Sequence, residues 1–170
     1  MDLIASAVAV LGALDKTPLA EWVQAEPLAF PLIEAAHVVS VMLVFGSIAM
    51  LDLRLLGVSS RNYAVVRISN EVLPWTWASF LVSVVSGCLL FVGQATNYLN
   101  NTEFRIKMIL LALAGLNLAV FHIFTWSKVR DWNSAAPTPV AAKLAALLSL
   151  ALWSGVVLEG RWIGWTLTAF

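Results

Sequence analysis

Four apolar runs, each about 20 residues long, constrain this chain more than any other feature. They occupy residues 28–51, 73–93, 104–126 and 140–158 of a chain of 170 residues. A helix of this length crosses a hydrocarbon core of about 30 Å, and a run of this kind is typical of transmembrane segments. Because every backbone polar group in lipid needs an internal partner, the runs predict four membrane-spanning helices.

The composition agrees with this interpretation. Hydrophobic residues make up 61% of the chain and charged residues 12%, whereas soluble domains carry roughly 25% charged residues. The formal net charge is zero, so no basic face indicates a nucleic-acid partner. Small residues four apart in the second run, Ser79, Ser83 and Gly87, predict close helix packing. We therefore expect an all-α fold, an integral membrane four-helix bundle, with the lipid bilayer as its surroundings.

The first 27 residues form a segment of their own ahead of the four-span domain at 28–170. The apolar stretch at residues 3–14 is too short to cross a bilayer, and the pair Thr17 and Pro18 is typical of a helix cap followed by a first-turn proline. These features predict short helices that lie in the membrane interface.

The second predicted span, at residues 73–93, is expected to begin at Pro74, as a first-turn proline would.

The positions of lysine and arginine predict the orientation, since short cytoplasmic loops retain these residues. Most of them fall in the first and third loops: Arg54, Arg61, Arg67, Lys128, Arg130 and Lys143. The other side holds most of the acidic residues. This distribution predicts a multi-pass protein of the bacterial inner (cytoplasmic) membrane, with both termini on the periplasmic side.

Three acidic, basic or imidazole side chains lie at least four residues inside the ends of the predicted spans, where such groups are costly and mark functional sites. They are Glu34, His37 and His122, and the chain has no other histidine. Glu34 and His37 are three residues apart and share a helix face. The Glu-x-x-His spacing occurs in di-iron bundles, but a second such motif is absent. We expect Glu34 to orient the imidazole or relay protons, with Lys107 and Arg161 near the same outer end.

The two histidines suggest haem b, whose iron is ligated by neutral imidazoles and whose propionates pair with arginine or lysine. Within two parallel spans, however, His37 and His122 are offset by about 15 Å along the membrane normal. That offset is too large for one iron, so we expect two separate metal-ligating sites, one in each leaflet. The second ligand would come from another subunit or from a methionine, Met108 near His37 and Met50 near His122. A quinone is the other candidate cofactor.

Further polar residues are expected at the inner end, near His122. Asp52 and Arg54 are expected to form a charge pair at the membrane boundary. Trp75 is either an interfacial anchor or a ring on which a quinone head group stacks. Asn117 either belongs to the cofactor site or bridges two helices, because it lies about 140° around the helix from His122.

Seven segments together resemble an uncharacterised family of small four-span bacterial membrane proteins, a domain of unknown function. They are FPLIEAAH (30–37), LDLRLLG (51–57), LPWTW (73–77), SGCLLF (86–91), YLNNTEFRIK (98–107), NLAVFH (117–122) and SLALWSGVVLEGRWIG (149–164). The resemblance implies the four-span architecture and no established reaction. It also draws attention to Glu34, His37, Asp52, Arg54, Trp75, Tyr98, Asn100, Lys107, Asn117, His122, Trp153 and Arg161. A looser architectural likeness links the chain to the membrane domain of copper-resistance proteins.

These observations support three hypotheses. In the first, the protein is a membrane redox component that binds haem b or quinone through its intramembrane histidines, or a small subunit of such a complex. In the second, it is a metal (copper) or proton transport module. In the third, it is a structural or assembly subunit whose histidines only hydrogen-bond to neighbouring helices. We expect an electron-transfer or accessory membrane protein more than an enzyme, either as a homo-oligomer or as part of a larger membrane complex.

Overall fold

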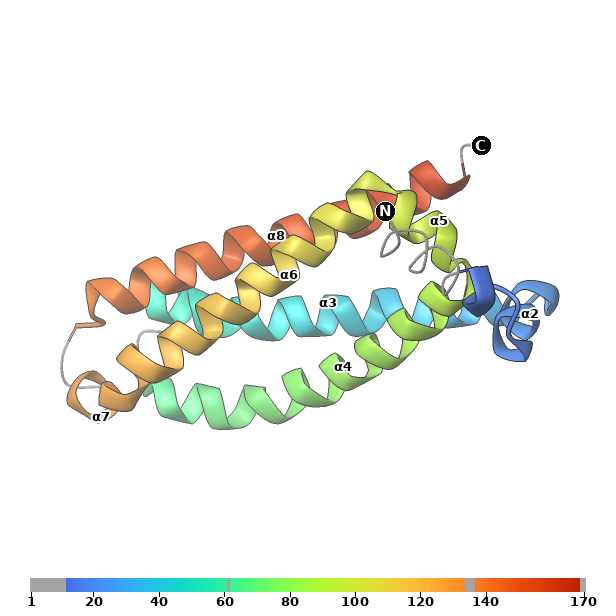
Figure 1. Cartoon of the computed structure of the whole chain (residues 1–170). Coiled ribbons are helices and arrows are strands. Elements are labelled where there is room, and N and C mark those ends of the chain that lie inside the picture. Colours follow the sequence, from blue (N-terminus) through green and yellow to red (C-terminus); the bar gives the residue numbers. More distant parts are fainter. Residues whose placement is uncertain (1–11, 61, 134–136, 169–170) are drawn as a thin grey trace.

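The computed structural model describes residues 12–60, 62–133 and 137–168, and these are largely helical. Four long helices dominate (Figure 1): α3 (Ala29–Leu56), α4 (Val65–Gly93), α6 (Thr102–Val120) and α8 (Val140–Thr168). The shorter elements are α2 (Pro18–Ala25), α5 (Ala95–Asn100), the π-turn η1 (Phe121–Thr125), the 3-10 turn η2 (Trp126–Lys128) and α7 (Val129–Trp132). The described chain thus confirms the all-α bundle.

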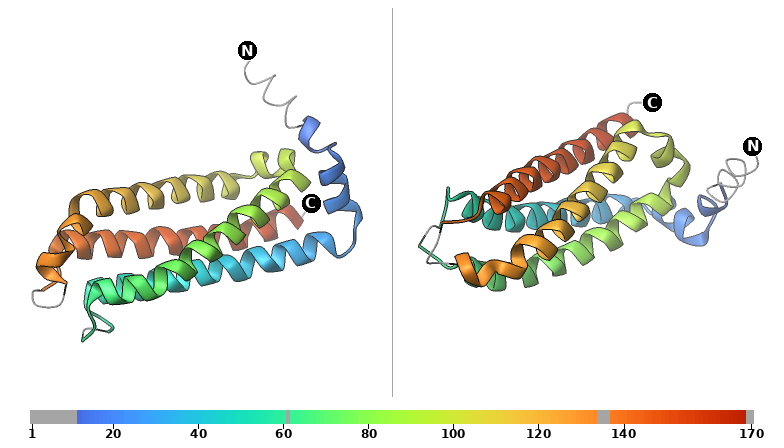
Figure 2. Two further views of the ribbon diagram at one scale, coloured as in Figure 1. Left: turned by 90° about the horizontal axis from the view of Figure 1, so that it is seen from below. Right: turned by 60° about the vertical axis from the view of Figure 1, so that its left-hand side comes forward.

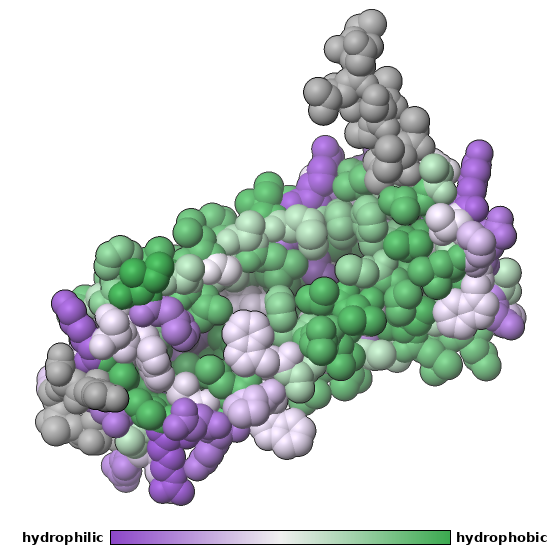
Figure 3. All heavy atoms as spheres, turned by 60° about the horizontal axis from the view of Figure 1, so that its bottom comes forward, coloured by the Kyte–Doolittle hydropathy of each residue, from purple (hydrophilic) through white to green (hydrophobic). Residues whose placement is uncertain are grey.

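Each long helix is long and apolar enough to cross a membrane, and α6 does so together with η1 and η2. The four candidate spans contain 27 to 29 residues. At about 1.5 Å per residue, each exceeds a hydrocarbon core of about 30 Å. Figure 3 shows apolar side chains over the middle of the molecule and hydrophilic side chains toward its two ends. The protein is therefore a membrane protein with lipid around its middle.

The helices pack unevenly around the bundle axis. Helix α3 packs on α4 and on α8, and α6 packs on α8, whereas α4 and α6 scarcely contact each other. Helix α2 and the last turns of α8 lie at one end of the bundle, called the α2 end below, and α7 marks the opposite α7 end (Figures 1 and 2). A buried cluster packs each end: Leu55, Val65, Phe121, Val129, Trp132, Ala142 and Ala146 at the α7 end, and Leu90, Tyr98 and Ile163 at the α2 end.

Helix α4 differs from the span predicted at 73–93, because it begins at Val65 and carries Pro74 in its interior. The expectation that Pro74 opens the helix is therefore wrong. The physical reason is a cap from far along the chain. The backbone N–H of Val66 donates to the side-chain oxygen of Asn133 at 3.0 Å, and the N–H of Val65 donates to the Asn133 carbonyl at 3.4 Å. These bonds satisfy N–H groups that a helix start leaves open.

Helix α2 begins as expected from its cap residues. The Thr17 side chain accepts a hydrogen bond from the N–H of Ala20 at 3.2 Å, and Pro18 occupies the first turn. The Gln24 amide donates to the carbonyl of Gly93 at 2.6 Å, which joins α2 to the end of α4. The helix expected at residues 3–14 lies largely outside the described residues.

Candidate functional site

His37 reaches from α3 to the backbone of α4. Its Nδ1 atom lies 2.9 Å from the carbonyl oxygen of Ser83 and 3.1 Å from the hydroxyl oxygen of Ser86. A carbonyl oxygen can only accept, so Nδ1 carries the proton and Nε2 presents a lone pair. Gly87 permits this approach, because a Cβ atom at position 87 would lie 3.0 Å from the imidazole Cε1 atom. The α4 backbone therefore sets both the position and the tautomer of His37.

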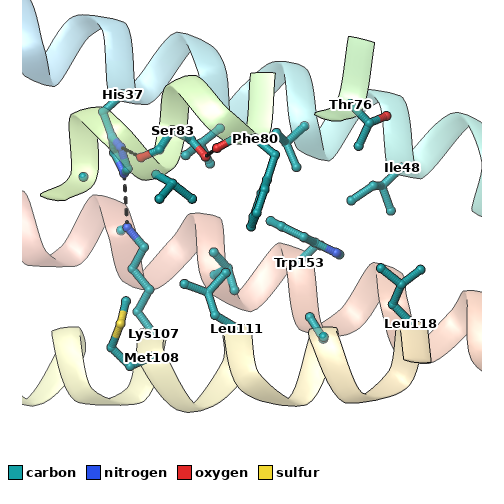
Figure 4. Close-up of a pocket in the computed structure, with 18 of the residues that line it drawn as sticks. His37, Ile48, Thr76, Phe80, Ser83, Lys107, Met108, Leu111, Leu118 and Trp153 are labelled. Carbon is teal, nitrogen blue, oxygen red and sulfur yellow. Dashed lines mark hydrogen bonds between the residues drawn. The ribbon is translucent and has the colours of Figure 1, made fainter. Parts of the chain in front are cut away.

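Lys107 reaches the same point from α6. Its Nζ atom lies 3.5 Å from Nε2 of His37, and Figure 4 shows the two side chains pointing toward each other. An ammonium donates and a lone pair accepts, so this contact suits a charged lysine beside a neutral imidazole. Gly160 of α8 lies beside the lysine, and a Cβ atom at position 160 would be in ordinary van der Waals contact with Nζ at 3.5 Å. The structure thus brings together two residues that the sequence placed at one end of the bundle.

Glu34 and Tyr98 extend this polar end of the bundle. Glu34 lies one helical turn before His37 and lines the same cavity. Tyr98 of α5 is buried, and its ring packs against the rings of Phe91 and Phe104. Burial, and then the negative charge of Glu34, raises the pKa of Tyr98 to about 12. The phenol is therefore a neutral donor at physiological pH.

A cavity of about 1110 Å³ runs between the four long helices from this polar end toward the α7 end. Its middle is apolar: Phe80 of α4 and Trp153 of α8 lie next to each other across it, and Leu111 and Leu118 line the α6 side (Figure 4). Helices α4 and α6 both contribute to the wall but scarcely contact each other. The volume exceeds the range of about 300–1,000 Å³ that is usual for small-molecule pockets. A ligand with a large apolar part fits this space.

Polar side chains also line the α7 half of the cavity, among them Asp52, Asn117 and Ser149. Asp52 is 6% exposed, and the Ser149 hydroxyl hydrogen-bonds to its carboxyl group. The Asn117 amide donates to the carbonyl of Ala145 at 3.0 Å and so joins α6 to α8. Asn117 therefore bridges two helices and also lies on the cavity wall, so its expected part in a cofactor site stays a prediction.

His122 borders the cavity near its α7 end, because it lies in η1, which leads through η2 into α7, whereas His37 lies at the polar end. It lies in the π-turn and is exposed. Its Nδ1 atom is 3.3 Å from the carbonyl of Leu118 on the same helix, and its ring packs against Phe121 and Trp126. The two histidines therefore do not converge on one point.

Three predicted site residues are absent from the cavity wall: Arg54, Arg161 and Trp75. The Arg54 Nε atom donates to the carbonyl of Tyr63 at 2.8 Å. Among the described residues no salt bridge joins it to Asp52, so the expected charge pair is wrong. Residues two apart on a helix point in different directions, which explains the separation. Arg161 is exposed, and Trp75 is 72% exposed, as an interfacial anchor would be.

Metal ligation was also expected at His37 and His122. Within the described ranges, no three side chains of His, Cys, Asp or Glu come together as metal ligands. A metal at either histidine would therefore need further ligands of another type, from a bound group or from another chain.

Residues 29–166 match the family model described as Family of unknown function (DUF6644). The chain belongs to this family. The match covers nearly all of the four long helices and confirms the resemblance to an uncharacterised four-span family. No curated protein and no solved structure matches the chain.

Sequence reasoning missed several parts of the site in this DUF6644 protein. Gly87 gives the imidazole its space, but a glycine in an apolar span usually indicates only close helix packing. Nothing in the local sequence shows that Ser149 bonds to a carboxyl group on another helix. Trp153 was noticed through the family resemblance alone, because its role depends on the ring of another helix.

Proposed function

We propose that the protein is a membrane redox component that binds a lipid-soluble quinone in the cavity between its long helices. The observation that carries the proposal is the pair of His37 and Lys107, with Nε2 and Nζ 3.5 Å apart at the polar end of a largely apolar cavity of about 1110 Å³. A quinone combines carbonyl acceptors on a ring with a long apolar tail. The Lys107 ammonium suits one carbonyl, and the cavity wall suits the ring and tail.

The polar end also suits the proton chemistry of a quinone, which takes up two protons and two electrons to become a quinol. His37 can accept or release a proton at Nε2 while Nδ1 keeps its bond to the Ser83 carbonyl. The aromatic rings of Phe80 and Trp153 lie further along the same wall. The two electrons come from the redox centre of a partner protein, and this chain serves as a small subunit of that larger complex.

Haem b is the second candidate, and the bond from Nδ1 of His37 to the Ser83 carbonyl favours it. Histidines that ligate metals usually donate their other ring N–H in this way. Lys107, however, lies directly before Nε2, where an iron would have to bind. Haem therefore requires a displacement of Lys107 and a second ligand, for which Met108 in the same wall is available.

Titration of decylubiquinone into the purified protein in lipid nanodiscs, followed by tryptophan fluorescence, tests the first proposal. Lys107→Met keeps the side-chain length and removes a charged hydrogen bond of about 1.5–3 kcal/mol, so binding should weaken about 10- to 100-fold. Arg105→Met is the matched control, because Arg105 is exposed on the same helix. Equal affinities of the wild type and Lys107→Met would overturn the proposal.

A visible absorption spectrum separates haem from quinone. Protein produced with a haem supply should show no Soret band if the cavity serves a quinone. A Soret band that disappears in His37→Gln and persists in His122→Gln would instead establish the haem alternative.

We infer that the protein lies in the bacterial inner membrane with its α2 end toward the periplasm. The support is the concentration of basic residues at the α7 end, because the cytoplasmic side retains lysine and arginine. Six of the chain's 10 lysine and arginine residues lie in sequence within or next to the two loops at this end: Arg54, Arg61, Arg67, Lys128, Arg130 and Lys143. Alkaline phosphatase fused after Phe170 should be active and a green fluorescent protein fused there should be dark. The opposite pattern would reverse the orientation.

A further inference from the structure

Asp52 is a buried carboxyl group at the opposite end of the cavity from the proposed quinone head group. It follows His37 by 15 residues on α3, which corresponds to about 22 Å along the helix. Asp52 is 6% exposed and lines the cavity. The Ser149 hydroxyl bonds to its carboxyl group, but the Oδ2 atom is fully covered and has no hydrogen-bond partner among the described residues.

No positive charge compensates this carboxyl group within the described part of the chain. On α3 itself, Arg54 turns to the carbonyl of Tyr63. On α4, Arg67 and Glu71 are exposed and pair with each other at 3.1 Å. Among the side chains that the structure describes, the remaining titratable groups toward this end are exposed: Lys143 on α8, His122 in η1, Lys128 in η2 and Tyr63 in the loop before α4.

An ionised carboxylate without a compensating positive charge is far more costly to bury than a neutral acid. A metal cation would also neutralise the charge, but it needs several oxygen, nitrogen or sulfur ligands and space around the bound atom. Oδ2 has no such space, and the described residues offer no group of three His, Cys, Asp or Glu side chains. A proton needs only the one oxygen atom.

We propose that Asp52 is a proton-binding site of the cavity, occupied by a proton in the resting protein. The equilibrium is the simple one in which the carboxylic acid releases a proton to water at the α7 end and becomes a carboxylate. This first part stands independently of any ligand.

A second part rests on the proposed function. A quinone tail that fills the cavity removes water from the neighbourhood of Asp52 and so favours its neutral form. At pH values at which Asp52 is ionised in the ligand-free protein, ligand binding is then accompanied by proton uptake. By reciprocity, the apparent affinity for the ligand decreases as the pH rises through the titration of Asp52.

Infrared difference spectra of the ligand-free protein in liposomes test the first part. They are recorded between pH about 6, where exposed carboxyl groups with a pKa of about 4 are already ionised, and high pH. In this range we expect a carboxylic-acid C=O band that disappears at high pH in the wild type and is absent in Asp52→Asn. Glu71→Gln, which changes an exposed carboxylate, should keep the band. A band that persists unchanged in Asp52→Asn would overturn the proposal.

Ser149→Ala gives a second measurement that does not alter the carboxyl group itself. It removes the hydrogen bond to Asp52, so the pH at which the band titrates should change. Ser154→Ala on the same helix, whose side chain has no hydrogen bond to Asp52, should leave that pH as in the wild type. The same titration in both variants would argue against Asp52 as the origin of the band.

Decylubiquinone titrations at a series of pH values test the second part. We expect the affinity of the wild type to fall by up to about tenfold per pH unit across the titration, and that of Asp52→Asn to vary less. If decylubiquinone does not bind at any pH, the proposed function fails while the infrared band still decides the proton site. If it binds with the same pH dependence in both proteins, the linkage to Asp52 is wrong.

Discussion

The Nε2 atom of His37 and the Nζ atom of Lys107 lie 3.5 Å apart, although 70 residues separate them along the chain. Their helices, α3 and α6, scarcely contact each other, so the two side chains meet across the end of the cavity. The Nδ1 atom of His37 bonds to the Ser83 carbonyl on α4, and the Lys107 ammonium lies beside Gly160 of α8. A ligand head group in this cavity therefore meets a donor and a proton acceptor at a single place.

The two histidines should differ in their effect on ligand binding. We expect His37→Gln to weaken decylubiquinone binding about tenfold or more, because the imidazole that orients the Lys107 ammonium is lost. His122→Gln should change the affinity by less than about twofold, since His122 is exposed and bonds only to its own helix. Fluorescence titration of both variants provides the measurement, and losses of equal size would contradict the assignment of the head group to His37.

Gly87 should be needed for the position of His37. In Gly87→Ala the new methyl group would lie 3.0 Å from Cε1 and 3.4 Å from Nδ1, so the imidazole must move away from the Ser83 carbonyl. We expect severalfold weaker quinone binding and a stability loss of about 1–3 kcal/mol from overpacking.

The control for this substitution is Gly46→Ala on α3, where a Cβ atom would meet nothing within 4 Å. It should leave binding unchanged and stabilise the helix by up to about 1 kcal/mol. Thermal unfolding in detergent measures the stabilities. If both alanine variants bind the quinone as the wild type does, Gly87 has no part in positioning the imidazole.

The parts of the fold that depend on local sequence were predicted well. Four apolar runs correspond to four long helices because burial in lipid acts on each run separately. The cap formed by Thr17 and the first-turn position of Pro18 follow from neighbouring residues alone. The helical spacing of Glu34 and His37 likewise places both on the wall of one cavity.

The parts that depend on contacts between distant segments were not predictable in this way. The early start of α4 needs Asn133, which lies 67 residues after Val66. The direction of Arg54 away from Asp52 depends on the loop carbonyl of Tyr63. In each case a local rule was outweighed by a hydrogen bond that only the folded bundle supplies.

The Asn133 cap leads to a prediction about stability. Asn133→Ala removes the acceptor for the N–H of Val66, and loss of a side-chain cap costs about 1 kcal/mol. Asn100→Ala, which changes an exposed residue of α5, should stay within about 0.5 kcal/mol of the wild type. Unfolding by sodium dodecyl sulfate in mixed micelles, followed by circular dichroism, gives both values. Equal stabilities of the two variants would show that the backbone bond from Val65 to Asn133 suffices as a cap.

Tyr98 should titrate abnormally at alkaline pH. Its pKa is raised to about 12 by burial and by the charge of Glu34, against an unfolded value of about 10. The neutral phenol is therefore favoured by folding. The corresponding stability is complete below pH about 10 and is lost as the pH rises toward about 12. In alkaline unfolding experiments, the Tyr98→Phe variant should lack this contribution to the loss of stability between pH about 10 and about 12.

Tyrosinate absorbance gives the direct measurement, and Tyr63→Phe leaves Tyr98 as the only tyrosine of the chain's 2. In that background Glu34→Gln should lower the pKa of Tyr98, because the phenolate no longer faces a negative charge. Glu26→Gln, at an exposed position before α3, should leave the titration as it was. Since burial is the larger cause, the pKa of Tyr98 should stay above its usual value even in Glu34→Gln. A titration that is insensitive to Glu34→Gln would place the Glu34 carboxylate away from Tyr98 and so outside the polar end of the cavity.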